Sequence, residues 1–293
     1  MEKRVVFKSA WLPWLLIVPQ MAVILVFFFW PAAQAILQSL QQQDAFGTSV
    51  EFVGLDNFRQ LLDEPSYLAS FKTTAFFSVL VAVIGISLSL MLAVFADRIV
   101  HGGTFYKTML ILPYAVAPAV AAVLWVFMFS PSLGVVAYAL GKIGIDWNHL
   151  LNSDHAMTLI VMAAVWKQVS YNFLFFLAGL QSIPRSLIEA AAIDGARPWR
   201  RFWTVQFPLL SPTTFFLLVI NVVYAFFDTF AIVDAATQGG PGKDTAILVY
   251  KVYYDGFKAM DLGGSAAQSV VLMLIVVLLT VIQFRYVEKK VNY

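Results

Sequence analysis

The chain has 293 residues, of which 60% are hydrophobic and 12% charged, and its formal net charge is +2. This composition excludes an ordinary water-soluble domain and is typical of an all-α integral membrane protein. The small net charge gives no reason to expect nucleic-acid binding. The sequence contains no cysteine, which excludes disulfides and thiolate metal sites.

Six apolar segments are long enough to cross a bilayer, which takes about 20 residues in a helix. We expect these spans at residues 10–40, 71–96, 105–129, 155–181, 213–236 and 266–284. The first segment is too long for a signal peptide and no small-residue cleavage site follows it, so we expect it to be retained. Kinks or irregular ends are predicted in the first span at Pro13, Pro19 and Pro31, and the third span contains Pro113 and Pro118.

An even number of spans places both termini on one side of the membrane, and the basic residues indicate which side. The termini side carries twelve of them: Lys3, Arg4, Lys8, Arg98, Lys107, Arg185, Arg197, Arg200, Arg201, Arg285, Lys289 and Lys290. The opposite side carries six: Arg59, Lys72, Lys142, Lys243, Lys251 and Lys258. The positive-inside rule therefore predicts cytoplasmic termini and a cytoplasmic loop between the fourth and fifth spans.

That loop, residues 182–212, is a charged interruption between two apolar spans. Ser186 and Glu189 have capping-box spacing, which predicts a short helix beginning at Ser186. Gly195 supplies a C-terminal stop. Pro198 suits the first turn of a second helix over residues 199–206, which we expect Pro208 to end. Two short helices between spans suit the docking of a cytoplasmic partner rather than catalysis.

The spacing of residues within this loop resembles the EAA loop of ABC-importer permeases. Glu-Ala-Ala occupies 189–191, Gly195 follows after three residues, and the stretch 205–208 ends in proline. The family pattern closes with Ile-x-Leu-Pro, and this chain keeps apolar Val and Phe in the two variable places. In that family the first helix enters a cleft of the ATPase and its Glu pairs with a basic residue. The resemblance thus assigns ATPase coupling to Glu189, Ala190, Ala191 and Gly195, and the alternative is that Glu189 only caps its own helix.

Two other stretches carry the same resemblance. GLDNF at residues 54–58 is similar to the segment after the first span of sugar-type permeases. The stretch from GGP at 239–241 to about residue 266 is similar to their outer loop, which contacts the substrate-binding protein. Four long runs, at 112–125, 166–176, 182–196 and 223–230, narrow the likeness to glycerol-3-phosphate permeases of the carbohydrate class.

The resemblance implies a type I ABC-importer permease fold with six transmembrane helices and a cytoplasmic EAA coupling loop. It divides the chain into residues 1–71 (N-terminal tail, first transmembrane helix and first periplasmic loop), 72–284 (ABC transmembrane type-1 domain) and 285–293 (cytoplasmic tail). The implied location is the bacterial inner membrane. The implied partners are a second permease subunit in a heterodimer, a homodimeric ATPase subunit, a periplasmic substrate-binding protein and membrane lipid, with no nucleic acid.

The implied function is ATP-driven import of sn-glycerol-3-phosphate or a related glycerophosphodiester by alternating access, with another carbohydrate as the alternative substrate. No cofactor is expected on this chain, because ATP would bind to the partner subunit and be hydrolysed there. The stretch 240–245 looks like part of a phosphate-binding loop. That motif, however, requires Gly where Thr237 stands and Ser or Thr where Asp244 stands, so we do not expect ATP to bind here. His101, His149 and His155 show no metal-ligand spacing.

Polar side chains within the spans are the candidates for a substrate path, because burying a charge in hydrocarbon costs about 2.5–3.5 kcal/mol. Spacing predicts that Asn221, Tyr224 and Asp228 share one helical face, and that Lys167 and Tyr171 share another. The candidates are Lys167, Tyr171, Asn172, Asn221, Tyr224 and Asp228.

Lys167 and Asp228 differ in depth by roughly 6 Å at a rise of about 1.5 Å per residue, so they can meet. Such an ion pair is equally consistent with holding the bundle together and with a substrate site. Two other classes of protein stay open. The first is an ion-coupled secondary transporter that uses these two charges, and the second, with little support, is an intramembrane enzyme.

Overall fold

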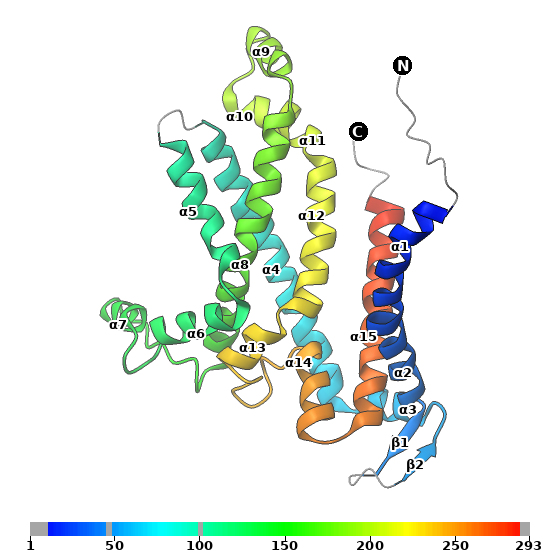
Figure 1. The fold of residues 1–293 in the computed structure, drawn as a ribbon. Coiled ribbons are helices and arrows are strands. Elements are labelled where there is room, and N and C mark those ends of the chain that lie inside the picture. Colours follow the sequence, from blue (N-terminus) through cyan, green and yellow to red (C-terminus); the bar gives the residue numbers. More distant parts are fainter. Residues whose placement is uncertain (1–10, 45–48, 99–101, 288–293) are drawn as a thin grey trace. The chain divides into compact units, whose positions relative to one another are not determined.

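The computed structural model describes residues 11–44, 49–98 and 102–287, and helices dominate it (Figure 1). In these ranges the sheet structure is one antiparallel pair, β1 (Gln41–Gln43) and β2 (Val50–Phe52), with Gln42 opposite Glu51. Several predictions concern residues outside the described ranges, namely Lys3, Arg4, Lys8, His101, Lys289 and Lys290.

The chain divides into two compact units, one of residues 1–63 and 252–271 and the other of residues 64–251 and 272–293. In the first unit, α1 (Trp11–Ile24), the π-helical η1 (Leu25–Phe29) and α2 (Trp30–Gln38) form one apolar span of 28 residues. Next comes α3 (Asp56–Asp63), held to β1 because the Asn57 side chain donates to the carbonyls of Ser39 and Gln41, both at 2.9 Å. The unit also contains η4 (Tyr254–Lys258) and the start of α15 (Leu262–Ile282), which η5 (Gln283–Val287) continues.

The second unit is organised around α8 (Ser153–Ser182), which packs against α4 (Pro65–Arg98), α5 (Gly103–Ala115) and α12 (Ser211–Val223) (Figure 1). Small residues let the backbones approach, as transmembrane interfaces generally require. Ala163 and Ala164 are fully buried on α8, and a Cβ added at Gly85 of α4 would touch the side chains of Asn172 and Asn221 at 3.6 Å. Phe77 and Phe173 fill the spaces between the helices.

The third predicted span is broken. Its two parts, α5 and α6 (Pro118–Met128), meet at 103°, so the apolar segment predicted at 105–129 is two helices, which make one span only if the bent pair is counted together. The cause is Pro118, which forces the preceding residues out of the helical conformation: Ala117 has ψ 142° and Val116 has ψ 130°. Figure 1 shows α6 lying across the end of the bundle, followed by α7 (Val135–Lys142).

The fifth predicted span is shorter than expected. The apolar helix runs from Ser211 to Asp228, comprising α12 and the π-helical η3 (Tyr224–Asp228), and α13 (Phe230–Ala236) is a separate helix packed against α6. The other four spans are confirmed at 11–38, 65–98, 153–182 and 262–285. The described chain therefore has five candidate spans, or six when the bent pair counts as one.

Candidate coupling loop and substrate path

The loop of residues 182–212 contains two short helices at one end of the second unit (Figure 1). The first, α9 (Arg185–Ile193), stops as predicted at Gly195, whose φ of +79° favours glycine. The Ala196 N–H donates to the Ala191 carbonyl and the Gly195 N–H to the Ala192 carbonyl, each at 3.0 Å. This is a Schellman motif, which fixes where the chain leaves the helix.

The beginning of α9 differs from the prediction. Its N-cap is Pro184, and no side-chain capping bond forms there, so the capping box is wrong. Pro184 sets the start one residue early, which places Ser186 inside the first turn rather than at the cap. Glu189 is exposed on the helix instead of folding back to its start.

The outer surface of α9 and the turn after it combines small, apolar and charged side chains. Ile193 is 86% exposed and Trp199 73% exposed, and Ala190 also faces outward. Apolar side chains this exposed at one tip of a protein are typical of a surface that another protein covers.

The second helix of the loop also departs from its prediction. It begins at Pro198 as expected, with α10 (Pro198–Arg201), but it does not end at Pro208. The π-helical η2 (Phe202–Gln206) leads directly into α11 (Phe207–Leu209), and Pro208 occupies its first turn.

The base of the loop is packed into the bundle. Ile183 and Leu210 are buried at its two ends. A Cβ added at Gly179 of α8 would lie 2.9 Å from Leu210 Cδ2 and 3.0 Å from Thr213 Oγ1. The loop is therefore attached to α8 and α12 with no free space between them, so a displacement of the loop would be passed to both helices.

Two of the polar candidates form a closed pair between α8 and α12. Asn172 Nδ2 donates to Asn221 Oδ1 at 3.1 Å, and Asn221 Nδ2 donates to Asn172 Oδ1 at 2.8 Å and to the Leu217 carbonyl at 2.7 Å. Both side chains are fully buried. Tyr224 is buried beside them and donates to the Ala164 carbonyl at 3.2 Å.

The expectation that Asp228 shares a face with Asn221 and Tyr224 is wrong. Residues 224–228 form the π-helix η3, in which bonds run from i to i+5 rather than i+4. The wider turn shifts every later residue around the helix axis. Asp228 is consequently exposed on this chain, whereas Asn221 and Tyr224 are buried.

Lys167 is bound to the break in the third span. Its ammonium donates to the carbonyl oxygens of Val116 and of Tyr114, the latter at 3.4 Å. These carbonyls lie at the C-terminal end of α5, where a cation is favoured because the last helical carbonyls have no partner within the helix. The ion pairs in the described ranges are Arg59–Asp56 and Lys251–Glu64, so Lys167 does not pair with Asp228. Tyr171 lies half-buried on the same side, with its ring 6.0 Å from that of Tyr114.

The loop after α13 is fastened to the opposite end of the bundle from α9. The Thr245 hydroxyl donates to the Gly240 carbonyl at 2.7 Å, and Ser153 at the start of α8 donates to the Asp244 carboxylate. Gly239 has φ +77°, and a Cβ there would lie 2.7 Å from the Tyr250 ring, so only glycine fits.

Sequence reasoning missed an ion pair at this end, between α14 (Leu248–Tyr253) and the start of α4. Lys251 Nζ lies 3.0 Å from Glu64 Oε1, and the lysine side chain is buried. Partial burial alone would raise the pKa of Glu64, but hydrogen bonds from Ser66 and Lys251 outweigh it and hold that pKa below its usual 4.5. In the sequence, the sign of this ion pair is the position of Lys251 within the apolar run 246–254.

Comparison with known proteins gives a consistent result. Residues 85–293 match the family described as the binding-protein-dependent transport system inner membrane component. The sn-glycerol-3-phosphate transport system permease protein UgpA of Yersinia pseudotuberculosis is 61% identical over 287 residues, covering 98% of each chain. Its namesake in Pectobacterium atrosepticum is 60% identical over 292 residues, covering 100% of this chain and 99% of the relative.

Solved structures share the fold. A bacterial ABC transporter involved in the import of the acidic polysaccharide alginate superposes with a TM-score of 0.80 at 24% identity, covering 94% of this chain and 96% of that chain. It has also been solved in complex with an alginate-bound periplasmic protein. The methionine ABC transporter MetNI, in an inward-facing conformation, superposes with a TM-score of 0.53 at 15% identity, covering 80% of this chain.

Proposed function

The chain belongs to the family of binding-protein-dependent transport system inner membrane components, and from this premise we propose that it is the membrane-spanning subunit of an importer of sn-glycerol-3-phosphate. Members of this family are permease subunits and are not themselves catalytic. The observation that carries the substrate is 60–61% identity, over nearly the whole of both chains, to relatives named for that compound.

We further propose that ATP is bound and hydrolysed on a separate, homodimeric ATPase subunit and that α9 is the contact with it. The exposed Glu189 would pair with a basic residue of the ATPase, while Ala190 and Ala191 let that subunit approach the helix backbone. The fixed turn at Gly195 supports this proposal because it sets how α9 projects from the bundle. The excess of basic residues that the sequence predicts for one side of the membrane supports a cytoplasmic location for the loop of residues 182–212 and for the termini.

The opposite end of the bundle would then face the periplasm. The loop around Gly239 and Thr245, bonded to Thr73 of α4 and to Ser153 at the start of α8, would contact the substrate-binding protein. A second permease subunit would complete the path as a heterodimer, because Lys167, Tyr171 and Asp228 are not enclosed by this chain alone. ATP binding would close the ATPase dimer, and the packed base of the loop would pass that motion to α8 and α12, giving alternating access.

For the path itself, we propose distinct roles for the six candidate residues. Lys167 and Tyr171 are only half-buried and lie at the broken span, where an ammonium and a hydroxyl can meet a phosphate. The exposed Asp228 would turn toward the partner subunit. Asn172, Asn221 and Tyr224 are engaged in buried hydrogen bonds, which favours a bracing role for these three.

The test is uptake of radiolabelled sn-glycerol-3-phosphate by cells that lack their own transporter for it and express this chain with its neighbouring subunits. We expect uptake with the wild type, none with Glu189→Ala, and wild-type uptake with Glu51→Ala, an exposed glutamate far from α9 in sequence. Normal uptake by Glu189→Ala would remove the coupling role. Uptake of another carbohydrate but not of sn-glycerol-3-phosphate would remove the substrate.

A further inference from the structure

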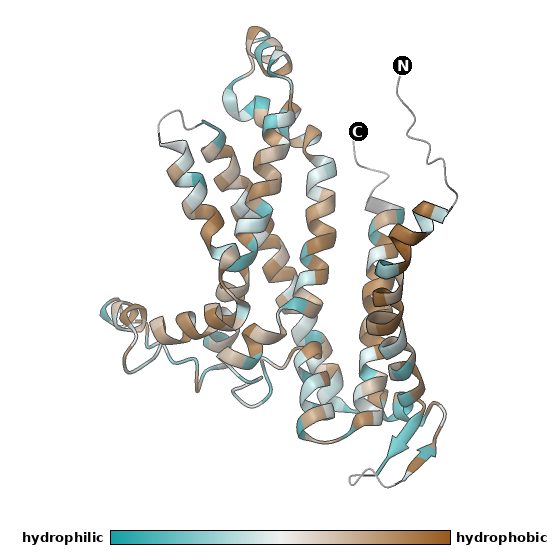
Figure 2. Cartoon of the chain, viewed as in Figure 1, coloured by the Kyte–Doolittle hydropathy of each residue, from teal (hydrophilic) through white to brown (hydrophobic). Residues whose placement is uncertain are grey.

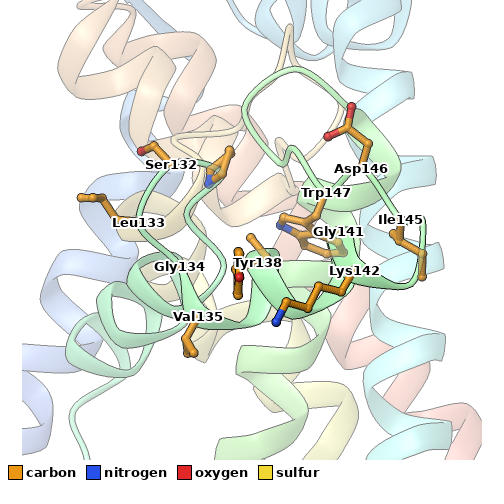
Figure 3. A pocket seen from close by; sticks show the side chains of 12 residues that line it. Ser132, Leu133, Gly134, Val135, Tyr138, Gly141, Lys142, Ile145, Asp146 and Trp147 are labelled. Atoms are coloured by element: carbon orange, nitrogen blue, oxygen red, sulfur yellow. The ribbon is translucent and has the colours of Figure 1, made fainter.

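Two concave regions of the second unit differ in what lines them. The pocket beside α7, of about 700 Å³, has Lys142 and Asp146 at separate edges with Trp147 between them, so its two charges do not face one ligand (Figure 3). The other region is a groove of about 810 Å³ between α4, the segment 198–207 and the first turn of α12. We call this second region the α4 groove.

One side of α4 forms the long wall of the α4 groove. The lining positions recur every four residues between 86 and 98, a spacing that marks one side of a helix. They extend over about 18 Å at a rise of about 1.5 Å per residue. The contact with α8 uses another side of α4, where Ser89 and Ala93 are fully buried. The groove side is therefore left open, and its side chains Met91 and Phe95 are exposed.

Aromatic side chains form the opposite wall. Trp199, Phe202, Trp203 and Phe207 line it, and they come from α10, η2 and α11. These rings pack on one another, with centroids 5.1 Å apart for Phe202 and Trp203 and 4.8 Å apart for Trp203 and Phe207. Phe202 is buried, whereas Trp199 and Trp203 are exposed. The wall is therefore a fixed apolar surface that is accessible from outside.

The groove carries its charge at one end. Among the residues that line it, Arg98 alone is charged, and this residue ends α4. Its neighbour Asp97 does not line the groove, and neither ion pair in the described part of the chain includes Arg98. The hydroxyl of Thr214 already donates to the Leu210 carbonyl at 3.0 Å. A long apolar groove with one cation at its end suits a ligand that has an apolar body and an anionic head.

The groove lies where a membrane span meets the polar end of the bundle. The span of α4 is 34 residues long, and α10 lies at the end where α4 stops (Figure 1). Figure 2 shows hydrophilic residues beside hydrophobic ones in the loop around α10, whereas the spans are mostly hydrophobic. Tryptophan is enriched at this depth of a bilayer. Basic pockets between transmembrane helices are known sites for anionic lipid headgroups.

The α4 groove and the proposed substrate path lie on different sides of α12. Phe216 of α12 packs against Phe175 at 5.1 Å, and Phe175 packs against Tyr171 at 4.8 Å. Thr214 precedes Phe216 by two residues, so it points about 200° away around the helix axis. On the proposed function, a second permease subunit that completes the path contacts the side of Phe216. The α4 groove is then left to the lipid of the bilayer.

We propose that the α4 groove binds an anionic phospholipid. The lipid phosphate lies against the Arg98 guanidinium, whose charge-assisted hydrogen bonds to phosphate are among the strongest in proteins. One acyl chain lies between α4 and the aromatic wall, and the other stays in the bilayer. A soluble anion would leave the apolar walls exposed, and a neutral lipid would leave Arg98 without an anion. The bound lipid joins α4 to the loop that carries α9.

The experiment uses the full chain with its accompanying subunits in nanodiscs that contain a small fraction of photoactivatable lipid. Phosphatidylglycerol and phosphatidylcholine with the same diazirine-bearing acyl chain are compared, and crosslinked peptides are mapped by mass spectrometry. We expect phosphatidylglycerol to label residues 86–98 and 198–207 about tenfold more than phosphatidylcholine does. Arg98→Gln should lower this labelling to the level of phosphatidylcholine, because the phosphate loses a charge-assisted bond.

Two further variants separate the groove from general charge and from misfolding. Met91→Trp should block labelling of residues 198–207 while the protein still inserts, because Met91 is exposed and lines the groove. Arg185→Gln, an exposed arginine that does not line the groove, should leave labelling unchanged. Equal labelling by the two lipids in the wild type would overturn the anionic preference, and full labelling of Arg98→Gln would overturn the headgroup contact. Absence of label from both segments would show that a protein segment covers the groove instead. None of these results depends on which substrate the transporter carries.

Discussion

The buried Asn172–Asn221 pair gives the sharpest stability prediction. Two hydrogen bonds join the amides at 3.1 and 2.8 Å, and removing either side chain leaves the other amide buried without that partner. An unsatisfied buried polar group costs about 1–3 kcal/mol, so Asn172→Ala and Asn221→Ala should each destabilise the protein by roughly that amount. Because the second substitution removes an amide already left without its partner, the double variant should cost less than the sum.

The measurement is a double-mutant cycle on reversible unfolding in mixed micelles of the purified protein. Hydrogen bonds between transmembrane helices average about 0.6 kcal/mol and reach about 1.7, so two of them predict a coupling energy of about 1–2 kcal/mol. Phe76→Ala, an exposed side chain on α4, serves as the unrelated control and should add independently. A coupling energy near zero would refute the bracing role. So would loss of uptake by Asn172→Ala with no change in stability, which would instead place the pair in the substrate path.

Three other substitutions test the account at separate places. Gly195→Val should reduce uptake strongly while the protein still inserts, because a backbone φ of +79° is strained for any residue with a Cβ. The amount of inserted protein is measured by blotting of membranes. Normal uptake would contradict the role of this turn in coupling. Lys167→Met should raise the KM for sn-glycerol-3-phosphate, whereas Lys167→Arg should keep much of the affinity; equal kinetics in both would exclude a phosphate contact. Because the pKa of Glu64 is lowered in the folded protein, its carboxylate contributes fully to stability above pH 4.5, and this contribution disappears as the pH falls through the folded pKa. The melting temperature of Glu64→Gln should therefore depend less on pH in that range than the melting temperature of the wild type. An unchanged dependence would contradict the ion pair with Lys251.

The features that could be predicted from sequence are those that local pattern determines. Hydropathy over about 20 residues located four spans closely, since a bilayer requires a long apolar helix whatever the tertiary packing. Gly195 was recognisable as a helix stop because the left-handed backbone conformation favours one residue type. Both inferences need only a few adjacent residues.

The features that could not be predicted depend on departures from regular helix or on distant contacts. A regular period of 3.6 residues per turn places Asp228 on the face of Asn221 and Tyr224, but the π-helix at 224–228 does not have that period. The hydrogen bond of Lys167 to Val116 joins residues 51 apart, and the ion pair of Lys251 with Glu64 joins residues 187 apart. A hydropathy scale assigns the same free-energy cost to a buried lysine whatever group it contacts. The partner of such a lysine therefore cannot be predicted from the hydropathy pattern.

The most direct test of the central claim is transport in a defined system. The purified complex is reconstituted into liposomes, the binding protein and labelled sn-glycerol-3-phosphate are added on the side of the loop around Gly239, and ATP is supplied on the side of α9. We expect accumulation that requires hydrolysable ATP, is absent with a non-hydrolysable analogue, and is lost in Glu189→Ala. Accumulation driven by an ion gradient without ATP would contradict it and would identify a secondary transporter.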